Sequence, residues 1–382
     1  MAQIEHELRV ALVGPNFPPQ VGGVELYLER LAIGLVELGC AVDVLVQQRH
    51  CDAGAAALEV RAPGLVVRRF QSRTHSRRFP VAPSLAFYLR SNSYRYDIVH
   101  GHSFHAAPAA MAAMVSNIDF VFTAHYHATG HTPAAKALHY LYAPIGRRAF
   151  SRAKAVIAVS RHEASLISKS YPFCADRVQV VYAGVDVDTL RLSEPYALEV
   201  PVALVSGRLE RYKQVDIALK AFALVGMPAL LVVTGDGPER ARLEDLSSRL
   251  GIRERVLFTG QVAEEELRRW QATARVVLSL SRHEAFGLSL LEGIAAGARA
   301  IASEIPASRE IAELAPSNVQ FVKPDATPEA VAKALMENLV AGRPSPATGL
   351  PSWKGLAARC TDIYRSVLCE HNEPLPELSC TA

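Results

Sequence analysis

Short apolar runs alternate with longer amphipathic segments along most of this chain, and this alternation limits the folds that it can adopt. Residues 8–14 form an apolar run that ends at a glycine, and residues 24–38 carry leucines at helical spacing along one face. Residues 41–47 form a second apolar run. A buried strand, a helix and another buried strand in this order make the repeating unit of a doubly wound parallel sheet.

The alternation continues to about residue 195 and begins again with the apolar run at residues 202–206. We therefore predict the α/β class, with two Rossmann-like doubly wound domains that face each other across a cleft. Because ligands of such sheets bind at the carboxyl ends of the strands, the cleft is the expected site. The predicted N-terminal domain, C-terminal domain, last helix and tail cover residues 1–195, 196–351, 352–372 and 373–382.

The remaining elements follow from the same pattern. Further strands are predicted at residues 66–70, 97–100, 120–123, 155–159, 178–182, 229–234, 256–258, 276–280, 300–303 and 318–322. Further helices are predicted at residues 83–92, 106–114, 133–150, 215–225, 239–250, 264–273, 288–296 and 328–340.

The composition excludes several classes of protein. Half of the 382 residues are hydrophobic and 21% are charged, which is typical of a folded globular protein and not of a disordered chain. The six cysteines show no C-x-x-C spacing, so we expect reduced thiols and a cytoplasmic location. The N-terminus lacks a basic stretch followed by an apolar one, and no window of 18 apolar residues occurs, so neither a signal peptide nor a membrane span is expected.

Basic residues are concentrated in the first half of the chain. Residues 1–195 contain 20 Lys and Arg against 15 Asp and Glu, whereas the remainder contains 21 against 23. Asp119 is the only acidic residue between Ile98 and His162. This half is therefore expected to favour anions, although a solvated basic face explains the same pattern.

Two carboxylates stand eight residues apart in Glu284-Ala-Phe-Gly-Leu-Ser-Leu-Leu-Glu292, after a predicted strand. If Leu288 begins a helix, Glu292 lies one turn into it and Glu284 lies in the preceding loop. The amides of Phe286, Gly287 and Leu288 then form an anion site at a helix N-terminus. One carboxylate can accept two hydroxyl groups of a ribose diol. The alternative is a capping acid and a solvated helical glutamate.

Two further segments carry phosphate chemistry. Gly207-Arg-Leu-Glu-Arg-Tyr-Lys213 follows a strand, and its cations Arg208 and Lys213 suit a diphosphate unless they are merely surface charges. Gly22-Gly23 stands between the first strand and helix, where adjacent glycines permit close approach of a phosphate. A plain turn is the other interpretation of this glycine pair. It does not fit G-x-G-x-x-G, so the dinucleotide fingerprint is absent.

Histidines gather after two predicted strands. His100, His102 and His105 follow one, and His125, His127 and His131 follow another. A zinc or iron site usually adds a carboxylate or cysteine, and none is near in the sequence. Hydrogen bonds to hydroxyl groups, or contact with an anion when protonated, are therefore expected instead of metal ligation.

Together these motifs resemble those of the GT-B glycosyltransferases of family GT4, from about Arg9 to about Val340. The strongest matches are Gly-Arg-Leu-Glu-Arg-Tyr-Lys213, Thr-Gly-Asp-Gly-Pro238, Leu-Phe-Thr-Gly260 and Ser-Arg-His-Glu-Ala-Phe-Gly-Leu-Ser-Leu-Leu-Glu292, which contains the family's E-x7-E signature. Gly-Gly-Val-Glu25, Thr-Ala-His125, Ile-Ala-Val-Ser160 and Ala-Gly-Val-Asp186 also fit.

The resemblance implies a retaining transferase that uses a nucleotide-diphosphate sugar as substrate and requires neither a cofactor nor a metal. By matching position, Glu292 holds the ribose hydroxyls and Glu284 contacts the sugar near its reacting carbon. His125 touches the donor sugar, Arg208 and Lys213 neutralise the diphosphate, and the last helix crosses back to the N-terminal domain. The other implied donor contacts are Gly22, Gly23, Gly235, Phe286, Gly287 and Leu288. One departure is Gln214 after Lys213, where the family usually has glycine.

Fixed cations and helix-terminal amides stabilise the charge that develops on a departing diphosphate. Only Glu284 is available at the sugar, because Glu292 is committed to the ribose. We therefore favour same-face attack assisted by the leaving phosphate over a covalent glycosyl-enzyme.

The acceptor is expected to bind the N-terminal domain, because the donor motifs lie mostly in the second. Its basic residues favour an anionic acceptor or a peripheral contact with an anionic membrane surface. These residues are Arg68, Arg69, Arg73, Arg77, Arg78, Arg147 and Arg148. Phe79-Pro-Val-Ala-Pro-Ser-Leu and Leu-Ser-Arg-His-Glu284 are similar to segments of mannosyltransferases that extend diphosphopolyprenol-linked sugars in exopolysaccharide synthesis.

Several substrates stay open at this point. GDP-mannose, UDP-glucose and UDP-N-acetylglucosamine all fit as donors, and no nucleic-acid partner is expected. The acceptor is a lipid-linked glycan in polysaccharide biosynthesis or a small soluble molecule such as an inositol phosphate or an antibiotic aglycone. The competing classes are a metal-dependent hydrolase built on the histidines and a catalytically silent nucleotide-sugar binding module.

Overall fold

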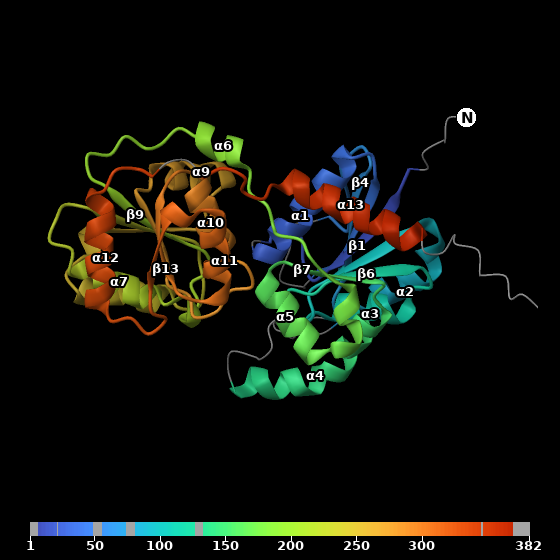
Figure 1. The fold of residues 1–382 in the computed structure, drawn as a ribbon. Helices are drawn as coiled ribbons and strands as arrows, with labels where there is room; N and C mark the ends of the chain where they lie inside the picture. Colours follow the sequence, from blue (N-terminus) through green and yellow to red (C-terminus); the bar gives the residue numbers. More distant parts are fainter. Residues whose placement is uncertain are drawn as a thin grey trace, which may run out of the picture. The chain divides into compact units, whose positions relative to one another are not determined.

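The computed structural model describes residues 7–20, 22–48, 56–73, 81–126, 133–344 and 347–369. The chain divides into two compact units, each built on its own largely parallel sheet (Figure 1). Unit 1 comprises Met1–Val181 with Trp353–Ala382, and unit 2 comprises Tyr182–Ser352. The prediction of two Rossmann-like α/β domains is therefore confirmed.

Unit 1 contains an eight-stranded sheet. Its strands lie in the order β3 (Leu58–Ala62), β4 (Leu65–Gln71), β2 (Ala41–Gln48), β1 (Arg9–Gly14), β5 (Ile98–His102), β6 (Asp119–Thr123), β7 (Ala155–Ala158) and β8 (Val178–Val180). All neighbouring strands are parallel except β3, which runs antiparallel to β4. The α-helices of this unit are α1 (Gly23–Glu37), α2 (Pro83–Asn92), α3 (Ala107–Val115), α4 (Pro133–Arg152), α5 (Arg161–Ser170) and α13 (Trp353–Cys369).

Unit 2 contains a six-stranded parallel sheet. Its strands lie in the order β11 (Val256–Gly260), β10 (Leu230–Thr234), β9 (Val202–Ser206), β12 (Val276–Ser279), β13 (Arg299–Ser303) and β14 (Val319–Val322). The α-helices are α6 (Val187–Leu192), α7 (Val215–Ala223), α8 (Arg240–Arg249), α9 (Glu264–Thr273), α10 (Leu288–Ala295), α11 (Pro306–Leu314) and α12 (Pro328–Val340). This is the doubly wound order 3-2-1-4-5-6, so the strand order reverses between β9 and β12.

Some elements were missing from the sequence-based prediction. Strand β3 forms a hairpin with β4 through Pro63-Gly64, where Gly64 has φ +80°. Helix α5 begins after Ser160, whose hydroxyl accepts a hydrogen bond from Glu163 N at 3.0 Å. Helices α6 and α11 were also not predicted. The signals were present as a Pro-Gly dipeptide before β4, the capping residues Ser160 and Asp186, and a proline at the start of α11, but these elements are short.

The division between the units falls between Val181 and Tyr182, earlier than the predicted boundary at residue 195. Helix α6 lies in that interval and packs against α9 and α10, so it belongs to unit 2. The main chain of Val185 also donates a hydrogen bond to Pro351 O at 2.9 Å, next to the point where the chain leaves unit 2.

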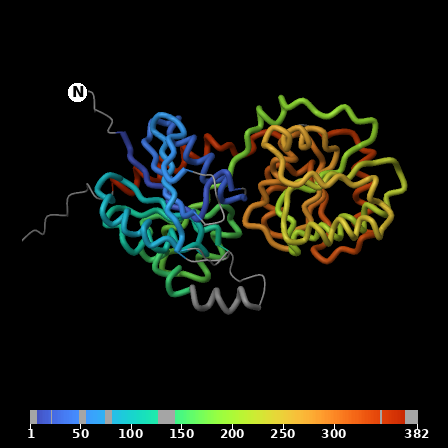
Figure 2. The backbone as a smooth tube through the Cα atoms, turned by 180° about the vertical axis from the view of Figure 1, so that it is seen from behind, coloured from blue at the N-terminus to red at the C-terminus, as the bar shows by residue number. Residues whose placement is uncertain are grey.

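Helix α13 packs on α1 of unit 1, although the whole of unit 2 separates them in the sequence (Figure 2). The two helices approach closely because Gly34 has no side chain, and a Cβ added there would lie 2.7 Å from Ala357 Cβ. Tyr364, which is fully buried, bonds His100 Nδ1 through its hydroxyl at 2.7 Å. Helix α13 therefore completes the hydrophobic core of unit 1.

Among the helices that the structure describes, none combines the length and apolar character needed to cross a lipid bilayer.

Candidate active site

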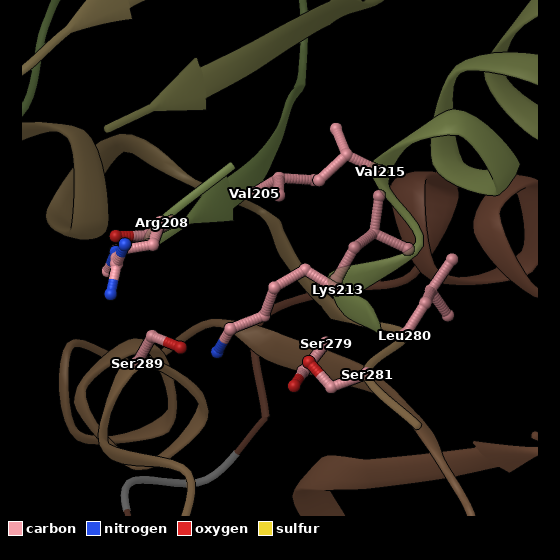
Figure 3. Close-up of a pocket in the computed structure, with 11 residues that line it drawn as sticks. Val205, Arg208, Lys213, Val215, Ser279, Leu280, Ser281 and Ser289 are labelled. Atoms are coloured by element: carbon pink, nitrogen blue, oxygen red, sulfur yellow. The ribbon is translucent and has the colours of Figure 1, made fainter. Parts of the chain in front are cut away.

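A pocket opens in unit 2 at the carboxyl ends of β9 and β12, where the strand order of the sheet reverses. It has about 280 Å³ of empty space, part of which is open to solvent. In Figure 3 the Lys213 side chain extends through this space toward Ser289. The reversal point of a doubly wound sheet is where ligands bind, so this is the candidate site. Its charged and hydroxyl-bearing residues are Ser206, Arg208, Lys213, Ser279, Ser281 and Ser289.

Lys213 forms an ion pair with Glu284. From the sequence the two residues were assigned to different parts of the donor, Lys213 to the diphosphate and Glu284 to the sugar. Lys213 Nζ lies 2.5 Å from Glu284 Oε1, and the two side chains are only 18% and 14% exposed. Burial acts to lower the pKa of the Lys213 ammonium, but the Glu284 carboxylate and, to a smaller extent, Tyr212 together outweigh it and raise this pKa above its usual value. The lysine therefore stays charged at the edge of the pocket.

Arg208 is the more accessible cation of the site. Its side chain is 65% exposed and bonds Glu210 Oε1 at 2.9 Å. The preceding Gly207 has φ +135°, which turns the chain after β9 and directs Arg208 to the pocket. An exposed guanidinium can exchange its carboxylate partner for a phosphate at little energetic cost.

The glycines of Thr-Gly-Asp-Gly-Pro238 pack against the loop that follows β9 and carries Arg208, called here the Arg208 loop. A Cβ added at Gly235, whose φ is +108°, would lie 2.1 Å from the backbone oxygen of Gly207. A Cβ added at Gly237 would lie 2.5 Å from Leu209 O, and Leu209 N donates to Asp236 O at 2.9 Å. Gly235 was predicted as a donor contact, but its place in the structure is against the Arg208 loop, outside the pocket lining.

Helix α10 begins at Leu288 as predicted, with Gly287 as its N-cap at φ +102°. Phe286 is buried and stacks on Tyr182 with 5.6 Å between ring centroids, so only its backbone is available to a ligand. Ser289, in the first turn, lines the pocket. The first-turn amides of a helix have no intrahelical acceptor and attract anions.

Glu284 lies in the loop before α10 and Glu292 lies one turn into the helix, as predicted. Glu292 Oε2 accepts a hydrogen bond from Gln271 Nε2 at 2.9 Å. Gln271, on α9, is itself buried and was not identified from the sequence. The two carboxylates of the motif thus have different partners, an ammonium for Glu284 and an amide for Glu292.

The remaining predicted site residues lie in unit 1. Gly22 precedes the first residue of α1, Gly23, and a Cβ added at Gly22 would lie 2.2 Å from Glu25 Oε2. A Cβ at Gly23 would meet open space, so this backbone is accessible. His125 follows β6 in the left-handed conformation, with φ +45°, and meets the Tyr27 ring edge-on at 5.0 Å.

The segment that follows His125 is held by a buried carboxylate that was not identified from the sequence. Glu163, on α5, accepts hydrogen bonds from the backbone amides of Tyr126 and Val159. Because Tyr126 directly follows His125, Glu163 ties the segment after β6 to the start of α5. A Ser-x-x-Glu pattern at a helix start signalled the capping role, but not the contact with Tyr126.

Comparison with known proteins identifies the family. Residues 21–189 match the family model described as Glycosyltransferase Family 4, and residues 186–343 match the one described as Glycosyl transferases group 1. The chain belongs to the GT-B glycosyltransferases of family GT4. The resemblance of the motifs to this family is therefore confirmed.

A D-inositol 3-phosphate glycosyltransferase of Xylanimonas cellulosilytica is 27% identical to this glycosyltransferase over 344 residues, which cover 79% of this chain and 82% of that protein. Sucrose-phosphate synthase from Thermosynechococcus elongatus has a similar fold, with a TM-score of 0.77 at 19% identity over 95% of this chain and 100% of that one. Anabaena HepE in complex with UDP-glucose has a TM-score of 0.67 at 16% identity, covering 96% and 98%.

The histidines of the glycosyltransferase differ in part from expectation. His100 bonds the Thr123 and Tyr364 hydroxyls, each at 2.7 Å, as expected for a histidine that contacts hydroxyl groups. Burial, with a smaller effect of His125, lowers the pKa of His100 to about 3, and burial also lowers that of His102 far below its usual value. Both stay neutral at physiological pH, so the expected contact of protonated histidines with an anion is wrong for this pair.

The metal-dependent hydrolase finds no support in the described part of the chain. There, no group of three His, Cys, Asp or Glu side chains is arranged to hold a metal ion. Both ring nitrogens of His100 are already bonded to hydroxyl groups. His127, which the hypothesis also used, and His131 lie outside the described residues.

Two arginines of the predicted basic surface instead form contacts within unit 1. The Arg69 side chain is 4% exposed and donates to Glu59 and to the backbone oxygens of Ala56 and Pro18. Arg68 is 25% exposed and pairs with Asp43 at 3.2 Å. The expectation of a free cation was wrong for Arg69, because strand alternation directs it inward. Arg77 and Arg78 lie outside the described residues.

Proposed function

We propose that this glycosyltransferase moves a hexose, with retention of anomeric configuration, from a nucleotide-diphosphate sugar to an acceptor hydroxyl. The observation that carries the proposal is the pocket at the β9–β12 reversal point, where Arg208 and Lys213 meet the N-terminus of α10. Two cations and free helix amides form a site for a doubly charged diphosphate. The Anabaena HepE structures with UDP and UDP-glucose support a nucleotide sugar as the donor.

In this proposal Arg208 and Lys213 bind the donor diphosphate. Negative charge grows on the β-phosphate as the bond from its bridging oxygen to the anomeric carbon breaks. Charges that are already in place stabilise this transition state more than the ground state. Their positive charge also supplies what a divalent cation supplies elsewhere, which is why we propose that no metal is required.

The two glutamates of the motif have separate roles in this scheme. Glu284, fixed by Lys213, contacts the transferred sugar near the anomeric carbon, and Glu292, oriented by Gln271, accepts the ribose hydroxyls. The acceptor oxygen bonds to the anomeric carbon on the face that the phosphate leaves, and the acceptor proton passes to the departing phosphate oxygen. Among the predicted donor contacts in unit 1, Gly22, Gly23 and His125 are proposed on the family resemblance alone.

For the acceptor we propose an anionic polyol, with an inositol phosphate as the first candidate. The relatives named D-inositol 3-phosphate glycosyltransferases, which are 27% identical to this chain, support it. The lipid-linked glycan, with peripheral binding at a membrane and a cytoplasmic location, is the alternative. The internal bonds of Arg68 and Arg69 weaken the case for a membrane-binding surface there.

The test begins with the donor. UDP-glucose, UDP-N-acetylglucosamine and GDP-mannose are compared by thermal shift, and the best is then incubated with D-inositol phosphate or with a diphosphopolyprenol-linked glycan. We expect transfer that survives EDTA and a product whose anomeric coupling constant matches the donor. Inversion, or loss of activity with EDTA, contradicts the mechanism. Binding to anionic but not neutral vesicles at low salt favours the lipid-linked acceptor.

The diphosphate assignment has its own variant. Arg208→Ala should weaken binding of free UDP or GDP and lower kcat by about 10²–10³-fold, by the scale for removing one charge-stabilising group. Arg249→Ala is the matched control, because Arg249 is similarly exposed on α8 and pairs only with Asp245 among the described ion pairs. Equal activity of the two variants removes Arg208 from the site.

A further inference from the structure

Gln214 adopts a backbone conformation that a residue with a side chain rarely takes. Its φ and ψ are 52° and 37°, in the left-handed region, between the 3-10 turn Arg211–Lys213 and helix α7. The residue is also buried, at 9% exposed. A non-glycine residue in this region requires compensation from its surroundings.

The side chain of Gln214 supplies that compensation. With its carboxamide oriented to match its neighbours, the nitrogen donates to Leu280 O at 2.7 Å and to Pro324 O at 3.1 Å. The oxygen accepts from Arg282 Nε at 3.1 Å. A side-chain amide has two N–H donors and two acceptor lone pairs on its oxygen. Three of these four sites are used at Gln214.

Two of these bonds, those with Leu280 and Arg282, connect the two segments that carry the ion pair of the pocket. Gln214 follows Lys213, whereas Leu280 and Arg282 lead to Glu284. A backbone hydrogen bond from Arg282 N to Tyr212 O at 2.9 Å runs alongside. The side chain of Gln214 therefore spans from the Lys213 turn to the Glu284 loop.

We propose that Gln214 is a positioning residue that holds Lys213 and Glu284 in register at the pocket. A glycine in its place satisfies the backbone conformation but removes the two side-chain bonds to Leu280 and Arg282. Of the contacts described above, the Arg282 N–Tyr212 O hydrogen bond and the Lys213–Glu284 ion pair then remain between the two segments. The structural part of this inference stands on geometry alone, and its effect on catalysis rests on the proposed transferase function.

The first experiment measures amide hydrogen exchange in the intact chain. Gln214→Gly keeps the left-handed conformation and removes the amide, and Gln214→Asn favours the same conformation with an amide too short to span the gap. Both should accelerate exchange about tenfold in residues 210–216 and 280–285, but not in β13. The control is Gln320→Ala, which removes a glutamine bonded to Glu337 and Asn338 away from the pocket. Unchanged exchange in both segments overturns the proposal.

The second experiment tests whether Gln214 acts through the Lys213–Glu284 ion pair. Gln214→Gly should lower kcat about tenfold and change the donor KM less than threefold, because a misplaced cation affects the transition state most. In a Lys213→Ala background the same change should alter kcat less than twofold. A second tenfold loss there shows that Gln214 acts elsewhere and overturns the proposal. If the parent transfers no sugar from any donor, the proposed function fails, and the exchange experiment alone decides the role of Gln214.

Discussion

The charges of Lys213 and Glu284 depend on each other, since the pair is partly buried and removing one leaves the other without its partner. The Lys213→Ala variant therefore leaves the Glu284 carboxylate without its ion-pair partner. Its effect on activity combines that loss with any loss of donor binding. Isosteric changes at the carboxylates keep the volume of each side chain, so their effects do not include a loss of packing.

Glu284→Gln should leave binding of free UDP or GDP within about threefold and lower kcat strongly, because its proposed contact is with the sugar. Glu292→Gln should weaken binding of the free nucleotide about tenfold, since it removes the charge of the proposed acceptor of the ribose hydroxyls, on the scale of hydrogen bonds to charged groups. Calorimetry of nucleotide binding and initial rates check the two separately. If both variants bind and transfer like the parent, neither glutamate has the proposed role.

Glu163 introduces a pH dependence into the stability of unit 1. Burial raises its pKa from 4.5 to about 7, although two backbone amides act in the opposite direction. Between these values the folded state binds the proton that the unfolded state has released. Stability therefore falls as pH rises from 4.5 to about 7.

Glu163→Gln should remove this slope, because glutamine does not titrate. The free energy of unfolding of the parent, measured with urea, should fall relative to that of the variant by about 1–3 kcal/mol across this pH range. Glu37→Gln, at an exposed position at the end of α1, is the control and should keep the slope. A parallel pH profile for Glu163→Gln and the parent contradicts the assignment.

At the scale of elements, the turn after β10 shapes the turn after β9. Gly235 combines a positive φ with a close contact to the backbone of Gly207, and backbone cannot move aside as a flexible side chain can. Gly251 also has a positive φ, +69°, but a Cβ there would meet nothing within 4 Å. The two glycines therefore separate the effect of conformation from the effect of contact.

Gly235→Ala should destabilise unit 2 by about 2–5 kcal/mol, from left-handed strain together with overpacking. Gly251→Ala should show only the strain, about 1–2 kcal/mol. Urea unfolding of the two variants checks the difference. If the two variants are destabilised equally, the Arg208 loop moves away from the methyl group added at Gly235. Gly235 then does not hold that loop rigidly, and the inference is wrong.

At the scale of the molecule, the units differ in how the chain builds them. Unit 2 is one continuous segment and contains every residue that lines the pocket. Unit 1 needs α13 from the other end of the chain to cover α1 and to pair with His100. A buried polar group left without its partner destabilises a fold by about 1–3 kcal/mol.

A fragment of residues 182–352 should fold in one cooperative transition and bind free UDP or GDP, but transfer no sugar. A fragment of residues 1–181 should not fold cooperatively, whereas joining it to residues 353–369 through a short glycine-serine linker should restore folding. Circular dichroism during urea titration checks all three. A stable fragment of residues 1–181 contradicts the role given to α13.

The sequence by itself determined the two doubly wound units, most strand and helix positions, the start of α10 and the motifs that identify the family. These are local signals, because burial on a sheet or along one helix face repeats every few residues. Tertiary structure alone decided that Lys213 pairs with Glu284, that Glu163 holds the segment after His125, and that Arg69 points inward. Each of these contacts joins residues on different elements, and it depends on how those elements pack. No periodicity along the chain records such a distance.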